Sequence, residues 1–254
     1  MSMRRCRALV LRGIPFGDTS LVERFFTREE GALTLLVKGA RRSGSPLLSV
    51  LQTGQLVEVL YYHRVGRDLQ LFKEASVLED FRGVRDDYSR LVSYSAICEA
   101  LDHSQLPGHA DEGLFDASVR CLADVAGNCP HPVNALYWFL LYLLGRSGYY
   151  IDLSRCAGCG REVEGFARLP GTSLERLGGG LRCPECTGPG PERPLSPRLV
   201  RVLHFLASSR REDVTTREIT RETRAALGSL LDELLQQHLE HWRGLGSLEA
   251  CAGL

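Results

Sequence analysis

The sequence predicts an α+β protein in which a small N-terminal β-barrel precedes helices that carry an inserted metal-binding module. Three observations indicate this order. Short runs of β-branched and aromatic residues fill the first 80 positions, helical periodicity replaces them from Val84 onward, and two Cys-x-x-Cys pairs interrupt the helical part. We expect a barrel domain at 1–80, a helical domain formed by 81–150 and 191–254, and a zinc-binding module at 151–190.

The barrel is predicted from five strand-like runs separated by turn-forming residues such as Pro15, Gly31, Pro46 and Gly66. The predicted strands are residues 6–14, 20–27, 32–37, 55–62 and 68–75. Five short strands in about 75 residues favour an OB-fold, whose exposed strand face and loops bind oligonucleotides. An SH3-like barrel remains the alternative.

Charge is distributed unevenly along the chain although the net charge is zero. Residues 1–73 hold 12 Lys/Arg against 6 Asp/Glu, which gives +6, whereas residues 74–150 hold 5 against 11, which gives −6. This asymmetry indicates one face that attracts nucleic acid and another that repels it.

The loop after the third predicted strand is the first candidate for phosphate contact, because Lys38, Arg41 and Arg42 stand there among glycines and serines. A P-loop is excluded, since Ser45-Pro46 occupies the place of the required Lys-Ser/Thr. A solvated hairpin tip is the alternative. Further DNA-binding candidates on this domain are Arg4, Arg5, Arg7, Arg12, Arg64 and Arg67.

Helical periodicity predicts helices near 88–101 and 114–125, followed by an apolar run at 135–144 that indicates a helix buried on every side. Pro132 is expected to open this third helix. The acidic pairs 79–80, 86–87 and 111–112 are interpreted as helix caps, not as acid/base pairs.

The C-terminal part predicts two further helices that close the bundle begun by residues 84–150. Ser196-Pro197 predicts the start of the first, and Thr215 with Glu218 forms a capping box for the second. Residues 187–195, rich in Pro and Gly, are expected to be a linker that is neither helix nor strand.

The cysteine spacing predicts one structural zinc ion bound by Cys156, Cys159, Cys183 and Cys186. Four protein ligands close the coordination sphere, so we expect no catalytic metal. Disulfides or unrelated thiols are the alternative, which is disfavoured because the other five of the nine cysteines lack partners at matching spacing.

Catalytic motifs are absent from the sequence. A zinc deaminase needs His-x-Glu before Pro-Cys-x-x-Cys, whereas the only His-x-Glu, at 238–240, follows the cysteines. A second metal site at His238, Glu240 and His241 is less favoured than a solvated helix end. The longest apolar run is about half of the ~20 residues that a membrane span requires. We therefore expect a cytoplasmic protein with no catalytic residues, no membrane contact and no small-molecule substrate.

Several sequence motifs resemble the bacterial RecO family over the whole chain. Three motifs precede the four-cysteine site: Arg-Ala-Leu-Val-Leu-Arg-Gly at 7–13, Phe-Phe-Thr-Arg-Glu-Glu-Gly at 25–31 and Val-Lys-Gly-Ala-Arg-Arg at 37–42. A fourth, which runs from His238-Leu239 to Ser247, follows it. The resemblance implies a non-enzymatic mediator of DNA recombination that binds ssDNA and dsDNA and anneals complementary strands.

The resemblance also implies two protein partners, RecR and the single-strand-binding protein (SSB), and a role in loading recombinase onto SSB-coated strands at the nucleoid. The SSB tail is acidic with an apolar end, so it requires a hydrophobic groove edged by cations. The candidates for that edge are Arg198, Arg201, Arg210 and Arg211, which lie beside Leu199, Val202 and Leu206. The alternative function is a zinc-containing adaptor whose barrel binds a protein partner and not DNA.

Overall fold

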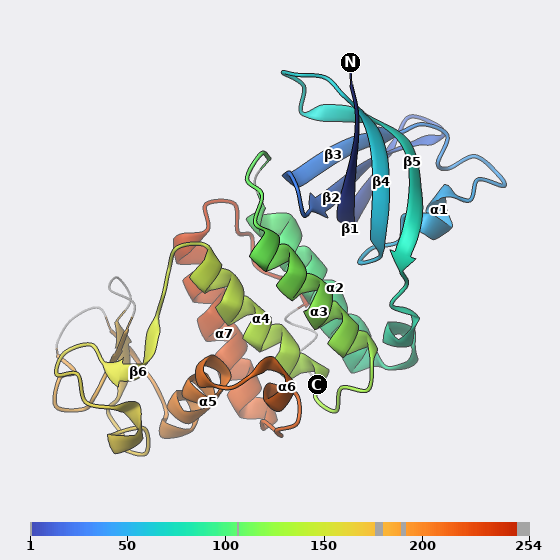
Figure 1. Cartoon of the computed structure of the whole chain (residues 1–254). Coiled ribbons are helices and arrows are strands. Elements are labelled where there is room, and N and C mark those ends of the chain that lie inside the picture. The colour runs from blue at the N-terminus through green and yellow to red at the C-terminus, as the bar shows by residue number, and fades with distance from the viewer. Residues whose placement is uncertain (1, 106, 176–179, 189–191, 248–254) are drawn as a thin grey trace. The chain divides into compact units, whose positions relative to one another are not determined.

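The computed structural model describes residues 2–105, 107–175, 180–188 and 192–247, and the chain divides into two compact units, 1–128 and 129–254 (Figure 1). The predicted α+β class is confirmed, with a closed five-stranded sheet at the N-terminus and a helical remainder that carries the four cysteines. The domain boundaries, and the single bundle expected from the two helical segments, stay predictions.

The first unit is built on the predicted barrel, whose strand order is β1-β2-β3-β5-β4 with β4 closing onto β1 (Figure 1). β3 and β5 run parallel, and the other neighbours are antiparallel. This is the OB-like arrangement that the sequence predicted. A short helix, α1 (Leu47–Val50), follows β3. The strands are β1 (Ser2–Phe16), β2 (Ser20–Thr27), β3 (Gly31–Val37), β4 (Leu56–His63) and β5 (Leu69–Glu79).

The barrel core forms because alternate residues of each strand point inward. Along β3 the buried positions are Gly31, Leu33, Leu35 and Val37, with half-buried residues between them. They pack against inward residues of the other strands, which include Val10, Leu21, Phe25, Val57, Val59, Tyr61 and Phe72. The odd and even residues of a strand therefore have different roles, one set inside the core and the other on the outer face.

Two long helices complete the first unit, after the short 3-10 helix η1 (Arg82–Asp86). α2 (Tyr88–Ser104) contacts β1 and β2, and α3 (Glu112–Ala126) packs on α2. Two of the three predicted acidic caps are confirmed, since Asp87 accepts from the Arg90 N–H and Asp111 from the Leu114 N–H. The pair at 79–80 caps nothing, because Asp80 pairs with Arg82.

The second unit contains a group of helices around α4 (Pro132–Arg146), which contacts α5 (Pro197–Ser208), α6 (Arg211–Val214) and α7 (Arg221–His238). The predicted starts of α4 and α5 are confirmed: Pro132 opens α4, and the Ser196 hydroxyl accepts from the Leu199 N–H at 3.2 Å. In the described part of the chain, no helix is long and apolar enough to span a membrane.

Two helix predictions in this unit are wrong. α7 begins at Arg221 with Thr220 as its N-cap, whereas Thr215 follows α6 and donates its hydroxyl to the Glu212 carbonyl. α4 is not buried on every side, because Trp138, Leu141 and Tyr142 are half-buried and line an open groove.

The cysteine region folds as a small four-stranded sheet of order β6-β8-β7-β9. Its strands are β6 (Asp152–Cys156), β7 (Ser173–Glu175), β8 (Gly180–Arg182) and β9 (Glu192–Pro194), with the 3-10 helix η2 (Val163–Gly165) after β6. The linker prediction is wrong for residues 192–194, since β9 pairs with β7. The prediction failed because it used only the local Pro and Gly content, whereas Arg193 is held in a strand by pairing with Leu174 on β7.

Candidate metal centre and nucleic-acid interface

The four predicted cysteines lie together at the ends of β6 and β8. Their Sγ atoms are all within 4.8 Å of one another, and those of Cys159 and Cys183 are 3.7 Å apart. A tetrahedron with metal–sulfur distances of about 2.3 Å has edges of about 3.8 Å, so the cluster fits a tetrahedral ion. The eight cysteines that the structure describes are free thiols, and Cys251 lies outside the described residues.

Backbone groups of the two knuckles prepare the sulfur atoms for a cation. The Cys183 N–H donates to Cys156 Sγ at 3.3 Å. Burial acts to raise the pKa of Cys156, but N–H groups of Cys183, Cys159 and Gly158 outweigh it and lower this pKa to about 6. Gly158 is required at its position, since a Cβ there would lie 2.9 Å from the Cβ of Cys186. Burial raises the pKa of the Cys183 thiol, so a bound cation would have to displace that proton. The site thus provides a closed set of four sulfur ligands.

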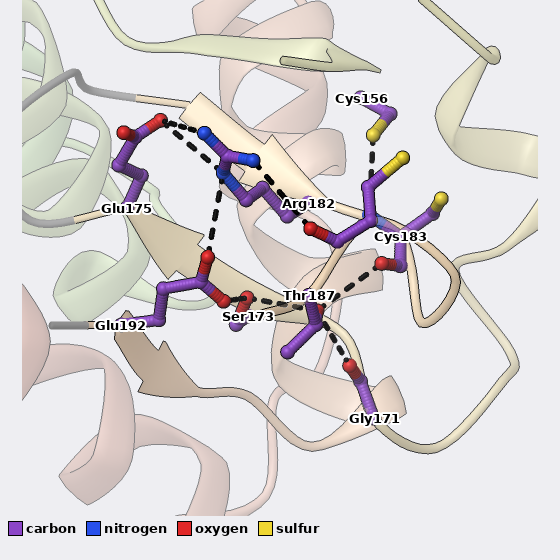
Figure 2. A network of polar contacts seen from close by, with 9 residues as sticks. Cys156, Gly171, Ser173, Glu175, Arg182, Cys183, Thr187 and Glu192 are labelled. Carbon is purple, nitrogen blue, oxygen red and sulfur yellow. Dashed lines mark hydrogen bonds and ion pairs between the residues drawn. The ribbon is translucent and has the colours of Figure 1, made fainter. Parts of the chain in front are cut away.

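A polar network supports the second knuckle from the side of the sheet (Figure 2). The Arg182 guanidinium contacts Glu175 at 3.1 Å and Glu192 at 3.4 Å, and one of its N–H groups points to the Cys186 carbonyl. The Thr187 hydroxyl lies 3.1 Å from the Cys183 carbonyl. β7, β8 and β9 therefore all help to position the Cys183–Cys186 knuckle.

A separate ion pair joins the two knuckles directly. Arg161 follows the first knuckle, and Glu185 lies inside the second. The Arg161 Nη1 group contacts both carboxylate oxygens of Glu185, at 3.1 and 3.2 Å. Because Arg161 and Arg182 already pair with carboxylates, their role at this site is to position the two knuckles.

Lys38, Arg64 and Arg67, three of the predicted DNA-binding residues, converge on one groove of about 290 Å³ at one end of the barrel. Tyr62, Leu36, Leu69, Gln70 and Leu71 complete its described lining. Gln70 holds the turn before β5, because it accepts from the Arg64 N–H and donates to the Arg64 and Arg67 carbonyls. Sequence reasoning missed Gln70, because its role depends on the burial of its amide beside the turn, which the sequence alone does not reveal.

The loop after β3 connects this groove to the β1–β2 turn. The Arg41 N–H donates to the Thr19 carbonyl at 2.8 Å, and the Arg41 side chain reaches the Gly17 carbonyl at 3.4 Å. Arg42 folds back over Gly39, whose φ of +72° suits glycine. Lys38 therefore lies between the β1–β2 turn on one side and the β4–β5 turn on the other.

Three of the other predicted cations pair with carboxylates and do not line that groove. Arg4 pairs with Glu30 at 3.0 Å, Arg5 with Glu58 at 3.3 Å, and Arg12 with Asp102 at 3.7 Å. Arg7 is exposed on β1. The structure thus separates the cations that line the groove, Lys38, Arg64 and Arg67, from those that pair with carboxylates, Arg4, Arg5 and Arg12. Contact of either set with DNA stays a prediction.

The four partner-binding candidates lie on and just after α5. Arg198, Arg201 and Arg210 are exposed, but Leu199, Val202 and Leu206 are at least 93% buried and form no open stripe. A groove of about 390 Å³ is lined by α4, by the segment that leads from α4 into β6, and by the end of α5. Its residues include Trp138, Tyr142, Arg146, Tyr150, Leu206 and Ser209. Sequence reasoning assigned Trp138 and Tyr142 to the core with the rest of the apolar run, although 138, 141, 142 and 145 repeat at helical spacing.

The His238 group shows no metal geometry. His238 stacks on Tyr149 with ring centroids 3.8 Å apart, and burial lowers its pKa. Within the described ranges, the four cysteines are the only cluster of three or more residues suited to a metal ion.

Comparison with known proteins gives two family matches that together span most of the chain. The model described as "Recombination protein O N terminal" matches residues 1–81, and "Recombination protein O C terminal" matches residues 85–248.

Curated relatives carry the description "DNA repair protein RecO". The protein from Chlorobium phaeobacteroides is 29% identical over 161 residues, which are 63% of this chain and 62% of that protein. The protein from Desulfatibacillum aliphaticivorans is 28% identical over 236 residues, 91% of this chain and 90% of the relative. The protein from Chlorobium luteolum is 28% identical over 262 residues, 98% of each chain.

Proposed function

Because the chain belongs to the RecO family of DNA repair and recombination proteins, we propose that it is a non-enzymatic recombination mediator. In this role it binds ssDNA and dsDNA through the barrel and anneals complementary strands in the cytoplasm, at the nucleoid. It acts with RecR to load recombinase onto strands coated by SSB.

One observation carries the DNA-binding proposal: the convergence of Lys38, Arg64 and Arg67 on a single groove beside Tyr62. These cations come from two segments 26 residues or more apart in sequence, so the fold, and not a local charge run, brings them together. Side-chain cations of this kind contact phosphates without reading sequence.

Annealing requires no catalytic residue. Base pairing supplies the free energy, and the protein needs only to neutralise the phosphates and bring two strands together. This accounts for a chain with a basic groove and a closed metal site. We assign zinc as the ion of the four cysteines, because four thiolates at tetrahedral spacing favour Zn²⁺ and leave no position for a substrate.

We further propose that the second unit holds the protein partners. The groove lined by Trp138, Tyr142 and Leu206 is largely apolar and aromatic, and Arg146 is part of its lining. Such a groove suits the apolar end of an acidic tail, with Arg201 and Arg210 on α5 and just after it for the acidic residues. RecR contact belongs to the same proposal at the level of the family.

The test is DNA affinity measured against salt concentration. Replacing Lys38, Arg64 and Arg67 together by Ala should flatten the slope of log affinity against log salt by about 2 to 3. The matched control replaces Arg4, Arg5 and Arg12, and it should flatten the slope by less, because each already pairs with a carboxylate. An unchanged slope in the groove variant contradicts the assignment, and absence of DNA binding at low salt favours the protein-adaptor alternative.

A further inference from the structure

A continuous apolar row crosses the outer face of the barrel beside the basic groove. The strand registers place its members directly opposite one another: Ile14 opposite Val22, Val22 opposite Leu36, Leu36 opposite Leu71, and Leu71 opposite Tyr62. Residues directly opposite on neighbouring strands share a face of the sheet. We call these five residues the apolar row.

The row lies outside the barrel, because the residues next to its members fill the core. Leu21, Leu35, Tyr61 and Phe72 are buried in the barrel interior, so their neighbours Val22, Leu36, Tyr62 and Leu71 face outward. All five row residues remain open to solvent in part, and Ile14 is 44% exposed. Phe16, two residues beyond Ile14 on the same face, is 55% exposed.

Cations border both ends of the row, although the two adjoining turns also carry Asp18 and Asp68. Lys38, Arg64 and Arg67 share the groove with Leu36, Leu71 and Tyr62, and none of its described lining residues is acidic. At the other end, the turn that follows Phe16 is hydrogen-bonded to Arg41 through the Gly17 carbonyl. An apolar protein segment gains nothing from this cationic rim, whereas a polymer with apolar faces and regular negative charge fits both features.

We propose that the apolar row and Phe16 form a base-binding surface for single-stranded nucleic acid, with the cations at its rim holding the phosphates. This inference rests on the proposed DNA-binding function and names the part of DNA that the barrel distinguishes. Strands lie about 4.8 Å apart, so the row spans roughly 19 Å, enough for several nucleotides of an extended strand.

The surface accounts for a preference between the two forms of DNA. In a duplex the base faces stack on one another and cannot contact Phe16 or Tyr62, whereas the phosphates stay accessible to Lys38 and Arg67. The cations therefore bind both forms, and the row selects the single strand. When two annealed strands become a duplex, their bases stack on one another and therefore leave the row.

The experiment compares three fluorescent probes of equal length on the full chain: oligo(dT), the same backbone with abasic residues, and a duplex. Phe16→Ala should weaken oligo(dT) binding about tenfold, in line with the loss of one stacked base, and leave the abasic and duplex probes unchanged. Leu78→Ala is the matched control, because Leu78 is 48% exposed on β5 outside the row. Phe16→Trp should keep the affinity, and oligo(dT) but not the abasic strand should quench the added fluorescence.

Equal losses on all three probes, or no loss on oligo(dT), overturn the base-binding surface. Equal wild-type affinity for oligo(dT) and the abasic strand overturns it too, while DNA binding by the cations stands. If the wild-type protein binds none of the probes, both this inference and the proposed function fail. Lys38→Ala separates these cases, since it should weaken binding to all three probes.

Discussion

Glu23 gives the sharpest prediction about stability. It lies on β2 among inward-facing residues, is 1% exposed, and makes no hydrogen bond or ion pair among the described residues. Its carboxylate lies over Gly13, where an added Cβ would overlap Glu23 Oε2. Because burial disfavours the charged form, the pKa of Glu23 is raised from 4.5 to about 8.

The sign of the pH effect follows from this shift. Below pH 4.5 the carboxyl is protonated in both the folded and the unfolded chain, and its burial costs no ionisation energy. As the pH rises from 4.5 to about 8, the unfolded chain releases the proton and the folded chain keeps it. The free energy of unfolding therefore falls by about 1.4 kcal/mol per pH unit, or about 3 kcal/mol between pH 5 and pH 7.

Glu23→Gln removes this titration at nearly constant volume. Between pH 5 and pH 7 the free energy of unfolding should fall by about 3 kcal/mol less in the variant than in the wild type. Urea unfolding followed by circular dichroism measures this difference. Fluorescence of Trp138 and Trp242 reports the second unit separately, since both lie within it. Glu58→Gln is the control, because Glu58 pairs with Arg5 on the outside of the barrel. Parallel pH profiles for wild type and Glu23→Gln would refute the reasoning.

Three further predictions concern the second unit. Purified protein should carry about one zinc ion per chain, and Cys183→Ser should lower its unfolding free energy by several kcal/mol, since metal binding is folding free energy here; metal analysis of a folded but zinc-free protein would contradict this. Arg182→Ala should weaken zinc binding roughly tenfold in competition with a chelator, because it releases the second knuckle, whereas Arg168→Ala, an exposed arginine of the same module, should not. A fluorescent acidic peptide with an apolar C-terminus should lose affinity in Trp138→Ala and in Arg201→Glu, and binding undiminished by charge reversal at Arg198, Arg201, Arg210 and Arg211 would reject this groove.

The metal cluster and the barrel were predictable because their signals are local. The two Cys-x-x-Cys pairs fix four ligands by spacing alone, and alternating burial along β3 appears directly in its residue pattern. The ends of β1 and β5 were missed for the opposite reason. Residues 2–5 and 76–79 are exposed and read as coil, but Ser2 pairs with His63 and Glu79 with Leu56, so neighbouring strands satisfy their backbone groups.

The start of α7 was mispredicted because a distant side chain decides it. Thr215 and Thr220 are both acceptable N-caps by local rules. The Asn134 amide on α4 donates to the Val214 carbonyl at 3.0 Å and also to the Arg217 carbonyl, and the His131 N–H donates to the Thr215 carbonyl. These bonds hold residues 214–217 outside α7, and the helix therefore begins at Arg221.

Charge patterning predicted a basic segment and an acidic segment, but it could not distinguish which charges remain for a ligand. Within the first unit, carboxylates of α2 and α3 pair with arginines of the barrel: Asp102 with Arg24 at 2.7 Å, and Asp116 with Arg28 at 3.0 Å. Asp102 is only 7% exposed and also lies 3.7 Å from Arg12. Part of the asymmetry therefore attaches the helices to the barrel, and it is not available to a nucleic acid.

The position of the remaining cations, and not their number, decides which of them can contact a ligand. Lys38, Arg42 and Arg67 form no ion pair in the part of the chain that the structure describes, and Lys38 and Arg67 line the groove at the end of the apolar row. A count of +6 for residues 1–73 therefore overstates the charge that DNA meets, while it understates the concentration of that charge at one site. The salt slope should accordingly depend on the grouped cations beside the row far more than on the net charge of the barrel.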